Sequence, residues 1–301
     1  MNALRLGIWT ALIFLLNSCL KEEPYKPSAD FTPSLIVHAY ISSDSQTMAW
    51  VSESSSILSK ITPANNADLS IKTRTSPIQN FVSSTDGHYT LINNATKPGD
   101  SFIFFCNHPR ASFAISGMRP HLPNISSIDT QSRLNPFVGG TLNFDLKIKD
   151  SAAIKNYYRL YVEKTVVEYI YDYKDILIDS QIVVNRIPIF GKEIAFIQND
   201  YNKYNSEEIL FSDATFNGVL EDFSFYTSDI LIKTLKDRPL KVTVKVENLS
   251  RALYEFYNNR NAHIWQQKSI IQVPGSVSGN INNVIGIVGS SSSFQRTFRL
   301  P

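Results

Sequence analysis

Cys19 is the residue whose surroundings point most directly to a chemical reaction. Arg5 precedes an apolar run from Leu6 to Leu16, and Asn17 and Ser18 then lead to the cysteine. The run is too short to cross a bilayer as a helix, which takes about 20 residues. Its charged start and apolar middle are typical of a secretory leader. A thiol at the end of such a leader is a candidate for acylation, which would tie the chain to a membrane.

This leader resembles the lipobox of bacterial lipoproteins, in which the cysteine becomes the lipidated N-terminus, although Asn17 departs from the usual small or β-branched residue. The resemblance implies a signal peptide over residues 1–18 and a lipid-anchored linker over residues 19–32. Acyl chains such as palmitate on Cys19 would hold the mature protein on the outer membrane. The alternatives are a secretory signal with an incidental cysteine and an N-terminal membrane helix.

Lys21, Glu22 and Glu23 follow the cysteine closely. A lysine and paired acids at this place resemble the export signal that sends some Gram-negative lipoproteins to the cell surface. We therefore expect a surface location, with the periplasmic face as the alternative. The same residues also fit a short solvated linker.

Residues suited to catalysis or metal binding do not converge in the sequence. The histidines form no H-x-H or H-E-x-x-H pattern, so we predict no metal site. No G-x-S-x-G elbow occurs. The adjacent acids Glu207-Glu208 and Glu221-Asp222 are expected to be solvated rather than to face each other across a glycosidase cleft. We predict no catalytic residue and no cofactor.

Gly286-Ile287-Val288-Gly289 is not followed by a lysine or a predicted helix, so it does not fit a phosphate-binding loop. Its glycines are expected to serve close packing or a bulge in a terminal strand. Cys106 lies in an apolar run and is expected to be a small buried hydrophobe without a disulfide partner.

Tyr169, Tyr171 and Tyr173 are the candidate binding residues. Exposed tyrosines combine an apolar face with a polar tip and suit contacts with a ligand or a protein partner. Tyr201 and Tyr204 extend the same aromatic group. Because alternate residues of a strand share a side, the three tyrosines could instead be one hairpin face packed on a sheet.

The elements that must position these residues are mostly strands. Apolar alternation predicts strands over residues 69–72, 88–92, 141–149 and 240–246. Apolar runs that follow Pro33 and the turn at residues 98–100 predict strands over residues 35–41 and 101–105. Residues 157–167 and 176–187 are β-rich runs that could pair as a hairpin. One short helix is predicted near residues 249–258, from apolar residues at i, i+4, i+7 and i+8. The fold class is therefore all-β, with two β-sandwich-like units.

Pro120 and Pro123 mark a plausible boundary between those units. We predict an N-terminal Ig-like β-sandwich over residues 33–124 and a larger, C-terminal β-rich domain with the helix over residues 125–301. The whole chain carries a net charge of +2. Since its basic residues are scattered, it lacks the field that would recruit nucleic acid.

Several segments together resemble the domain-of-unknown-function 4249 family of bacterial lipoproteins. They include the lipobox, the turn at residues 98–102, Asn156-Tyr157-Tyr158, Phe211-Ser212-Asp213, Phe216-Asn217-Gly218 and the glycine-bearing tail. Val284-Ile285 departs from the family's glycine. Members are often encoded beside TonB-dependent outer-membrane receptors, so the resemblance implies an accessory role in nutrient uptake and supplies no catalytic residue.

We therefore expect a non-catalytic outer-membrane lipoprotein that binds a ligand, or a TonB-dependent receptor as its partner, through rigid strands and variable loops. A structural or adhesive envelope protein is the first alternative, and a hydrolase with a spatially assembled site is the second. The sequence does not indicate an oligomeric state.

Overall fold

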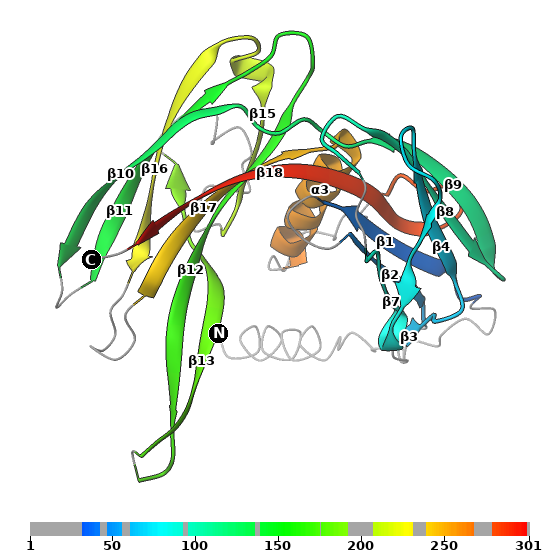
Figure 1. Ribbon diagram of the computed structural model, residues 1–301, viewed down its shortest axis with the longest axis horizontal. Helices are drawn as coiled ribbons and strands as arrows, with labels where there is room; N and C mark the ends of the chain where they lie inside the picture. Colours follow the sequence, from blue (N-terminus) through cyan, green and yellow to red (C-terminus); the bar gives the residue numbers. More distant parts are fainter. Residues whose placement is uncertain are drawn as a thin grey trace, which may run out of the picture. The chain divides into compact units, whose positions relative to one another are not determined.

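The computed structural model describes residues 32–42, 47–55, 61–92, 96–135, 139–174, 176–191, 207–230, 239–267 and 279–299 (Figure 1). Cys19, Lys21, Glu22 and Glu23 lie outside these segments, and so do Tyr201 and Tyr204. Lipidation and export therefore stay predictions. No helix in the described segments is long and apolar enough to cross a membrane.

The largest sheet has ten strands, eight of which follow one path. Their order is β13 (Leu177–Ile187), β12 (Tyr157–Tyr171), β17 (Pro239–Leu249), β18 (Ile285–Arg299), β1 (Leu35–Ile41), β2 (Met48–Glu53), β7 (His88–Thr90) and β6 (Val82–Ser83). Two further strands lie off this path, β15 (Ile209–Ser212) beside β12 and β3 (Thr62–Pro63) beside β2.

Two smaller sheets have four strands each. One follows the order β10 (Ile125–Asn135), β11 (Gly139–Lys149), β16 (Leu220–Ile230) and β14 (Phe190–Gly191). The other follows β5 (Gln79–Asn80), β4 (Asp68–Thr73), β8 (Ser101–His108) and β9 (Ala111–Met118). The described helices are α3 (Arg251–Gln267) and the 3-10 turns η1 (Thr85–Gly87) and η3 (Asp213–Thr215). The predicted all-β class with one α-helix is confirmed.

Alternating burial explains why these segments form strands. In β1, Leu35, Val37, Ala39 and Ile41 are buried while the residues between them are half-buried. Such a pattern places one face of a strand in a core and leaves the other for different contacts. The predicted hairpin also forms, since β12 and β13 pair antiparallel from Val162↔Ile187 outward.

One apolar core lies between the four-stranded sheet of β10, β11, β16 and β14 and the neighbouring part of the large sheet. Phe144 of β11 stacks on Phe225 of β16 at 5.0 Å between ring centroids. Leu160 of β12 and Val244 of β17 are fully buried in the same cluster. Burying each such side chain contributes roughly 1.5–3 kcal/mol to folding.

A second core lies between the sheet of β4, β5, β8 and β9 and strands β1, β2 and β7. It includes Val37, Val51, Ile71 and Phe104. Cys106 is buried in this cluster, and burial raises the pKa of its thiol to about 12. The prediction that Cys106 is a small buried hydrophobe is confirmed.

Strand β18 joins the two regions of the large sheet. It pairs parallel with β1, through contacts such as Ala39↔Val288, and antiparallel with β17, through contacts such as Glu247↔Ser293. The large sheet thus combines strands from both sides of residue 124. The division into domains over residues 33–124 and 125–301 stays a prediction.

The glycines at the start of β18 allow close approach, as predicted. Gly286 has φ +131°, and a Cβ there would lie 1.9 Å from the carbonyl oxygen of Val37. A Cβ on Gly289 would lie 2.9 Å from the side chain of Leu253 on α3. Only glycine fits at Gly286 without moving the backbone of β1.

The helix is longer than predicted and begins later. It runs from Arg251 to Gln267, whereas Leu249 ends β17. Asn258-Asn259 does not terminate it, although asparagine is an unfavourable helix residue. Arg260 and Asn261 both bind Glu208. These tertiary contacts hold the following turn, and propensity alone could not reveal them.

Candidate functional site

A polar cavity of about 400 Å³ lies between α3 and the large sheet. Its lining residues come from the β1, β12, β13, β17 and β18 region and from α3: Tyr40, Ser42, Arg159, Tyr161, Arg186, Lys245, Glu247, Tyr257, Arg260 and Ser293. Cavities of this size accommodate small molecules. It is the candidate ligand site of the protein.

Strand alternation explains why this face is polar. Leu160 and Val162 of β12 point into the first core, so Arg159 and Tyr161 occupy the opposite face. Arg159 lies directly across from Glu247, and Tyr161 from Lys245. The strand pairing of β12 with β17 therefore brings opposite charges together.

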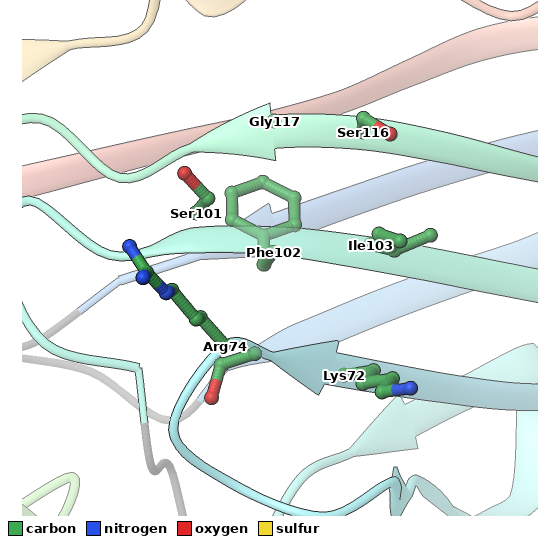
Figure 2. Close-up of a pocket in the computed structure, with 8 residues that line it drawn as sticks. Lys72, Arg74, Ser101, Phe102, Ile103, Ser116 and Gly117 are labelled. Atoms are coloured by element: carbon green, nitrogen blue, oxygen red, sulfur yellow. The ribbon is translucent and has the colours of Figure 1, made fainter.

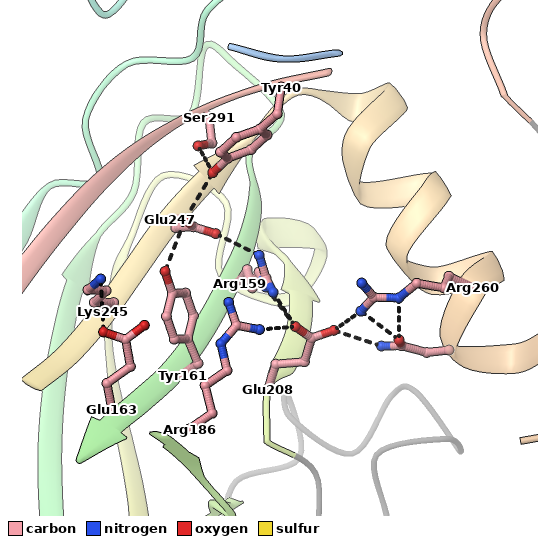
Figure 3. Close-up of polar contacts among 11 residues, drawn as sticks. Tyr40, Arg159, Tyr161, Glu163, Arg186, Glu208, Lys245, Glu247, Arg260 and Ser291 are labelled. Carbon is pink, nitrogen blue, oxygen red and sulfur yellow. Dashed lines mark hydrogen bonds and ion pairs between the residues drawn. The ribbon is translucent and has the colours of Figure 1, made fainter. Parts of the chain in front are cut away.

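Glu208 is the centre of an ion-pair network (Figure 3). Its Oε2 accepts hydrogen bonds from Nε of Arg159 at 2.8 Å and from Nη2 of the same residue at 2.5 Å. Nη1 of Arg186 donates to the same oxygen at 3.3 Å. Oε1 accepts from Nη2 of Arg260 at 2.5 Å and from Nδ2 of Asn261 at 3.2 Å. One buried carboxylate thus gathers three guanidinium groups from β12, β13 and α3.

Glu247 is the second buried carboxylate. Its Oε2 accepts from Nη1 of Arg159 at 3.2 Å. Its Oε1 accepts from the hydroxyls of Tyr40 at 3.1 Å and Tyr161 at 3.2 Å. The Tyr40 hydroxyl also lies 2.6 Å from Oγ of Ser291. Charge-assisted bonds of this kind fix each side chain in one orientation.

Aromatic rings face the guanidinium groups. Arg159 lies 4.4 Å from the ring centroid of Tyr257, and Arg260 lies 4.7 Å from the same ring. Arg186 lies 4.2 Å from the ring centroid of Tyr161. A guanidinium held against a ring keeps its N–H groups directed outward in its own plane.

Burial and charge act in opposite directions on Glu208. Burial by itself would raise the pKa of its carboxyl, but the positive charges of Arg159 and Arg260 and their hydrogen bonds lower that pKa below its ordinary value. Glu208 is therefore ionised at neutral pH. Burial, with the nearby charge of Glu247, raises the pKa of Tyr40 and of Tyr161, so both hydroxyls stay protonated donors.

The expectation of a solvated acid pair at Glu207-Glu208 was wrong for Glu208. Glu207 is exposed, whereas Glu208 is 6% exposed. Its main partner, Arg159, is 49 residues away in sequence. Sequence reasoning missed this network. The only local signal was a charged residue, Arg159, between apolar neighbours in a strongly β-rich run.

The predicted tyrosines lie on the hairpin of β12 and β13, outside the cavity. Tyr169 is 39% exposed and Tyr173 is 90% exposed, while Tyr171 is half-buried. Asp172 shapes the turn, since its Oδ1 accepts from the backbone N–H groups of Lys174 and Ile176, each at 2.8 Å. The structure thus places these tyrosines on the outer half of the hairpin.

His38 and His108 each contact a neighbouring side chain. His38 of β1 packs edge-on against Phe256 of α3 at 5.6 Å, and burial lowers its pKa. Nε2 of His108 lies 2.8 Å from the side-chain oxygen of Asn66. Within the described residues, no three of His, Cys, Asp and Glu form a group that could hold a metal ion.

A second hollow of about 440 Å³ lies on the sheet of β4, β8 and β9 (Figure 2). Lys72, Arg74, Ser101 and Ser116 line it and are exposed, and the ring of Phe102 lies over Gly117. These polar side chains are exposed, whereas Arg159, Glu208 and Glu247 of the first site are buried and ion-paired. The first cavity is therefore the better candidate for specific binding.

Residues that carried the family resemblance meet at one structural corner. Oδ1 of Asp150 accepts from Nδ2 of Asn156 at 2.9 Å and from the hydroxyl of Tyr158 at 2.8 Å. The backbone N–H of Asn156 donates to Asp213 at 2.6 Å, and that of Gly218 donates to Asp150 at 3.1 Å. These contacts hold the start of β12 in place, which gives this set a structural role.

The comparison with protein families gives a match that covers most of the chain. The family model described as a domain of unknown function (DUF4249) matches residues 22–297. A search of curated proteins finds no match to this chain. The match covers almost all of the strands and the helix described above.

Proposed function

We propose that this chain, which belongs to the DUF4249 family, is a non-catalytic, lipid-anchored outer-membrane protein that assists a TonB-dependent receptor in nutrient uptake. The lipobox at Cys19 supports the anchor, and Lys21, Glu22 and Glu23 support a surface location. The resemblance to a family whose members are often encoded beside TonB-dependent receptors supports the partner. The exposed hairpin of β12 and β13 is the observation that carries the proposal.

One face of the outer hairpin is uncharged and rich in apolar side chains. The pairings Thr165↔Val184, Val167↔Ile182 and Tyr169↔Ser180 place these side chains on the same face. Ile182 is 70% exposed and Val184 is 55% exposed. Contiguous exposed apolar side chains of this kind typically mark a protein–protein interaction site.

The hairpin also has a free edge as far as the described residues extend. β13 is the outermost strand in the order of the large sheet. An outer strand offers backbone donors and acceptors that a partner's strand can pair with. The aromatic and aliphatic side chains would add specificity to such pairing. We infer that the hairpin is the surface that contacts the receptor.

The test is co-purification of the lipidated protein from its native membrane, followed by mass spectrometry. Wild type is compared with a Tyr169→Ala/Tyr171→Ala/Tyr173→Ala variant. The matched control is Ile92→Ala/Leu122→Ala, which removes exposed apolar side chains elsewhere (71% and 53% exposed). We expect a TonB-dependent receptor with wild type and control and little with the tyrosine variant.

Two other outcomes would count against the proposal. Recovery of only cell-wall or adhesin components would favour a structural or adhesive envelope protein. If the tyrosine variant recovers as much receptor as wild type does, the uptake role would stand, but the hairpin would not be the contact site.

A further inference from the structure

We propose that the cavity under α3 binds a small molecule that carries an oxyanion, a carboxylate or a phosphate, through Arg186 and Arg260. This inference rests on the proposed function for the role of the ligand, but the binding itself is a property of this chain alone. Three observations support the inference: the net charge around the cavity, the guanidinium N–H groups without a partner in the described residues, and the contacts that fix those guanidinium groups.

Positive charge exceeds negative charge around the cavity. Within the described residues, the network contains four cationic side chains, Arg159, Arg186, Lys245 and Arg260. It contains three carboxylates, Glu163, Glu208 and Glu247. Lys245 and Glu163 pair with each other at 3.0 Å. These seven groups together carry one net positive charge, which a bound anion would balance.

Arg159 is the structural member of the set. All three of its nitrogens donate to Glu208 or Glu247, and its side chain is 6% exposed. Its contacts with Glu208 and Glu247 are buried and charge-assisted, so Arg159 secures β12 against β17. Each of its three nitrogens already donates to a buried carboxylate, so we assign Arg159 to the network rather than to the ligand.

Arg186 and Arg260 differ from Arg159 in exposure and in the donors they use. Their side chains are 34% and 36% exposed. In the described part of the chain, Arg186 donates only through Nη1, and Arg260 donates through Nε and Nη2. Nε and Nη2 of Arg186 and Nη1 of Arg260 are therefore available to an acceptor that enters the cavity.

The open donors are held in place before a ligand arrives. Arg186 rests against the ring of Tyr161, and Arg260 against the ring of Tyr257. Each is also anchored to Glu208 by one guanidinium nitrogen. Preorganised guanidinium forks match carboxylate and phosphate oxygens and lose little entropy on binding.

The size and lining of the cavity set limits on the ligand. A volume of about 400 Å³ lies at the lower end of small-molecule sites. The remaining lining is polar and aromatic, with the hydroxyls of Tyr40, Tyr161 and Tyr257. These features favour a compact organic acid or phosphate over an extended apolar molecule. A network that merely locks α3 to the sheet is the competing explanation.

Isothermal titration calorimetry on the full lipidated protein in detergent, with 150 mM NaCl, tests the inference. The probes are citrate for carboxylates, inorganic phosphate, and neutral erythritol. The variants are Arg186→Gln and Arg260→Gln. The matched control is Arg251→Gln, on the same helix, whose side chain is 75% exposed.

We expect citrate or phosphate to bind and erythritol not to bind. Each variant should weaken binding by about tenfold or more, since a hydrogen bond to a charged group is lost, while the control stays within about twofold. Whether citrate or inorganic phosphate binds shows whether the site prefers a carboxylate or a phosphate. A thermal melt verifies that each variant is folded, and Arg186→Lys replaces Arg186→Gln if that variant is not.

Absence of binding by both anions to the folded wild type would overturn the inference, and so would unchanged binding in both arginine variants. The receptor experiment is independent of this one. Anion binding without receptor recovery would contradict the proposed function alone, and receptor recovery without anion binding would contradict this inference alone.

Discussion

At the scale of single residues, the most informative group is the buried carboxylate of Glu208. It collects guanidinium groups from three separate elements. Removing this carboxylate would leave the buried Arg159 close to two other guanidinium groups without the negative charge that they share. The free energy of unfolding should therefore depend strongly on this one side chain.

We predict that Glu208→Gln lowers the free energy of unfolding by about 3–5 kcal/mol at pH 7. The matched control is Glu207→Gln, the exposed neighbour, which should change it by less than about 0.5 kcal/mol. Denaturant titration of each purified variant measures the difference. Equal effects at the two positions would contradict the role given to Glu208.

The pH dependence of this effect has a definite sign. The folded pKa of Glu208 lies below its ordinary value, so the unfolded chain takes up the proton first as pH falls. The stability from Glu208 is present above the unfolded pKa of about 4.3 and is lost as pH falls through the folded pKa. The difference in the free energy of unfolding between wild type and Glu208→Gln should therefore become smaller as pH falls. A difference that does not change with pH would contradict this account.

At the scale of elements, β18 depends on glycine where it meets β1. We predict that Gly286→Ala lowers the free energy of unfolding by at least about 2 kcal/mol, because the new Cβ would collide with the carbonyl of Val37 at a positive φ. Ser116→Ala, at an exposed position of β9, is the control. Thermal unfolding measures the stability of both variants. If Gly286→Ala is as stable as wild type, β18 does not approach β1 so closely.

The sequence predicted most strands because their signal is local. In β11, apolar and polar residues alternate over residues 141–149, and the apolar side chains are buried in the first core as a result. Gly286 and Gly289 were also read correctly, since glycines in a strand often permit close approach. The exposure of Tyr169 and Tyr173 was not predictable, because it depends on what lies beside the hairpin.

The ion-pair network could not be predicted for a physical reason. Arg159, Glu208 and Glu247 are far apart in sequence, and only the pairing of β12 with β15 and β17 brings them together. The helix end depends on the same network, because Arg260 and Asn261 bind Glu208. Local patterns contain no information on such long-range charge contacts.

At the scale of the whole molecule, the account requires a lipid anchor on Cys19. We predict that Cys19→Ser abolishes incorporation of an alkyne-labelled palmitate and releases the protein from the membrane fraction. Cys106→Ser is the control, because Cys106 is buried in a core, and it should keep both the label and the membrane location. Palmitate label that remains on the Cys19→Ser variant would contradict the prediction that Cys19 is the lipidated residue.

The central claim is that the outer hairpin contacts a TonB-dependent receptor, and site-specific photo-crosslinking in intact cells tests it most directly. A photoreactive residue replaces Ile182, on the apolar face of β13, or Ile61, which is similarly exposed (63%) but lies just before β3. We predict a receptor adduct at position 182 and none at position 61. Absence of the adduct at 182, or equal adducts at both positions, would contradict the claim.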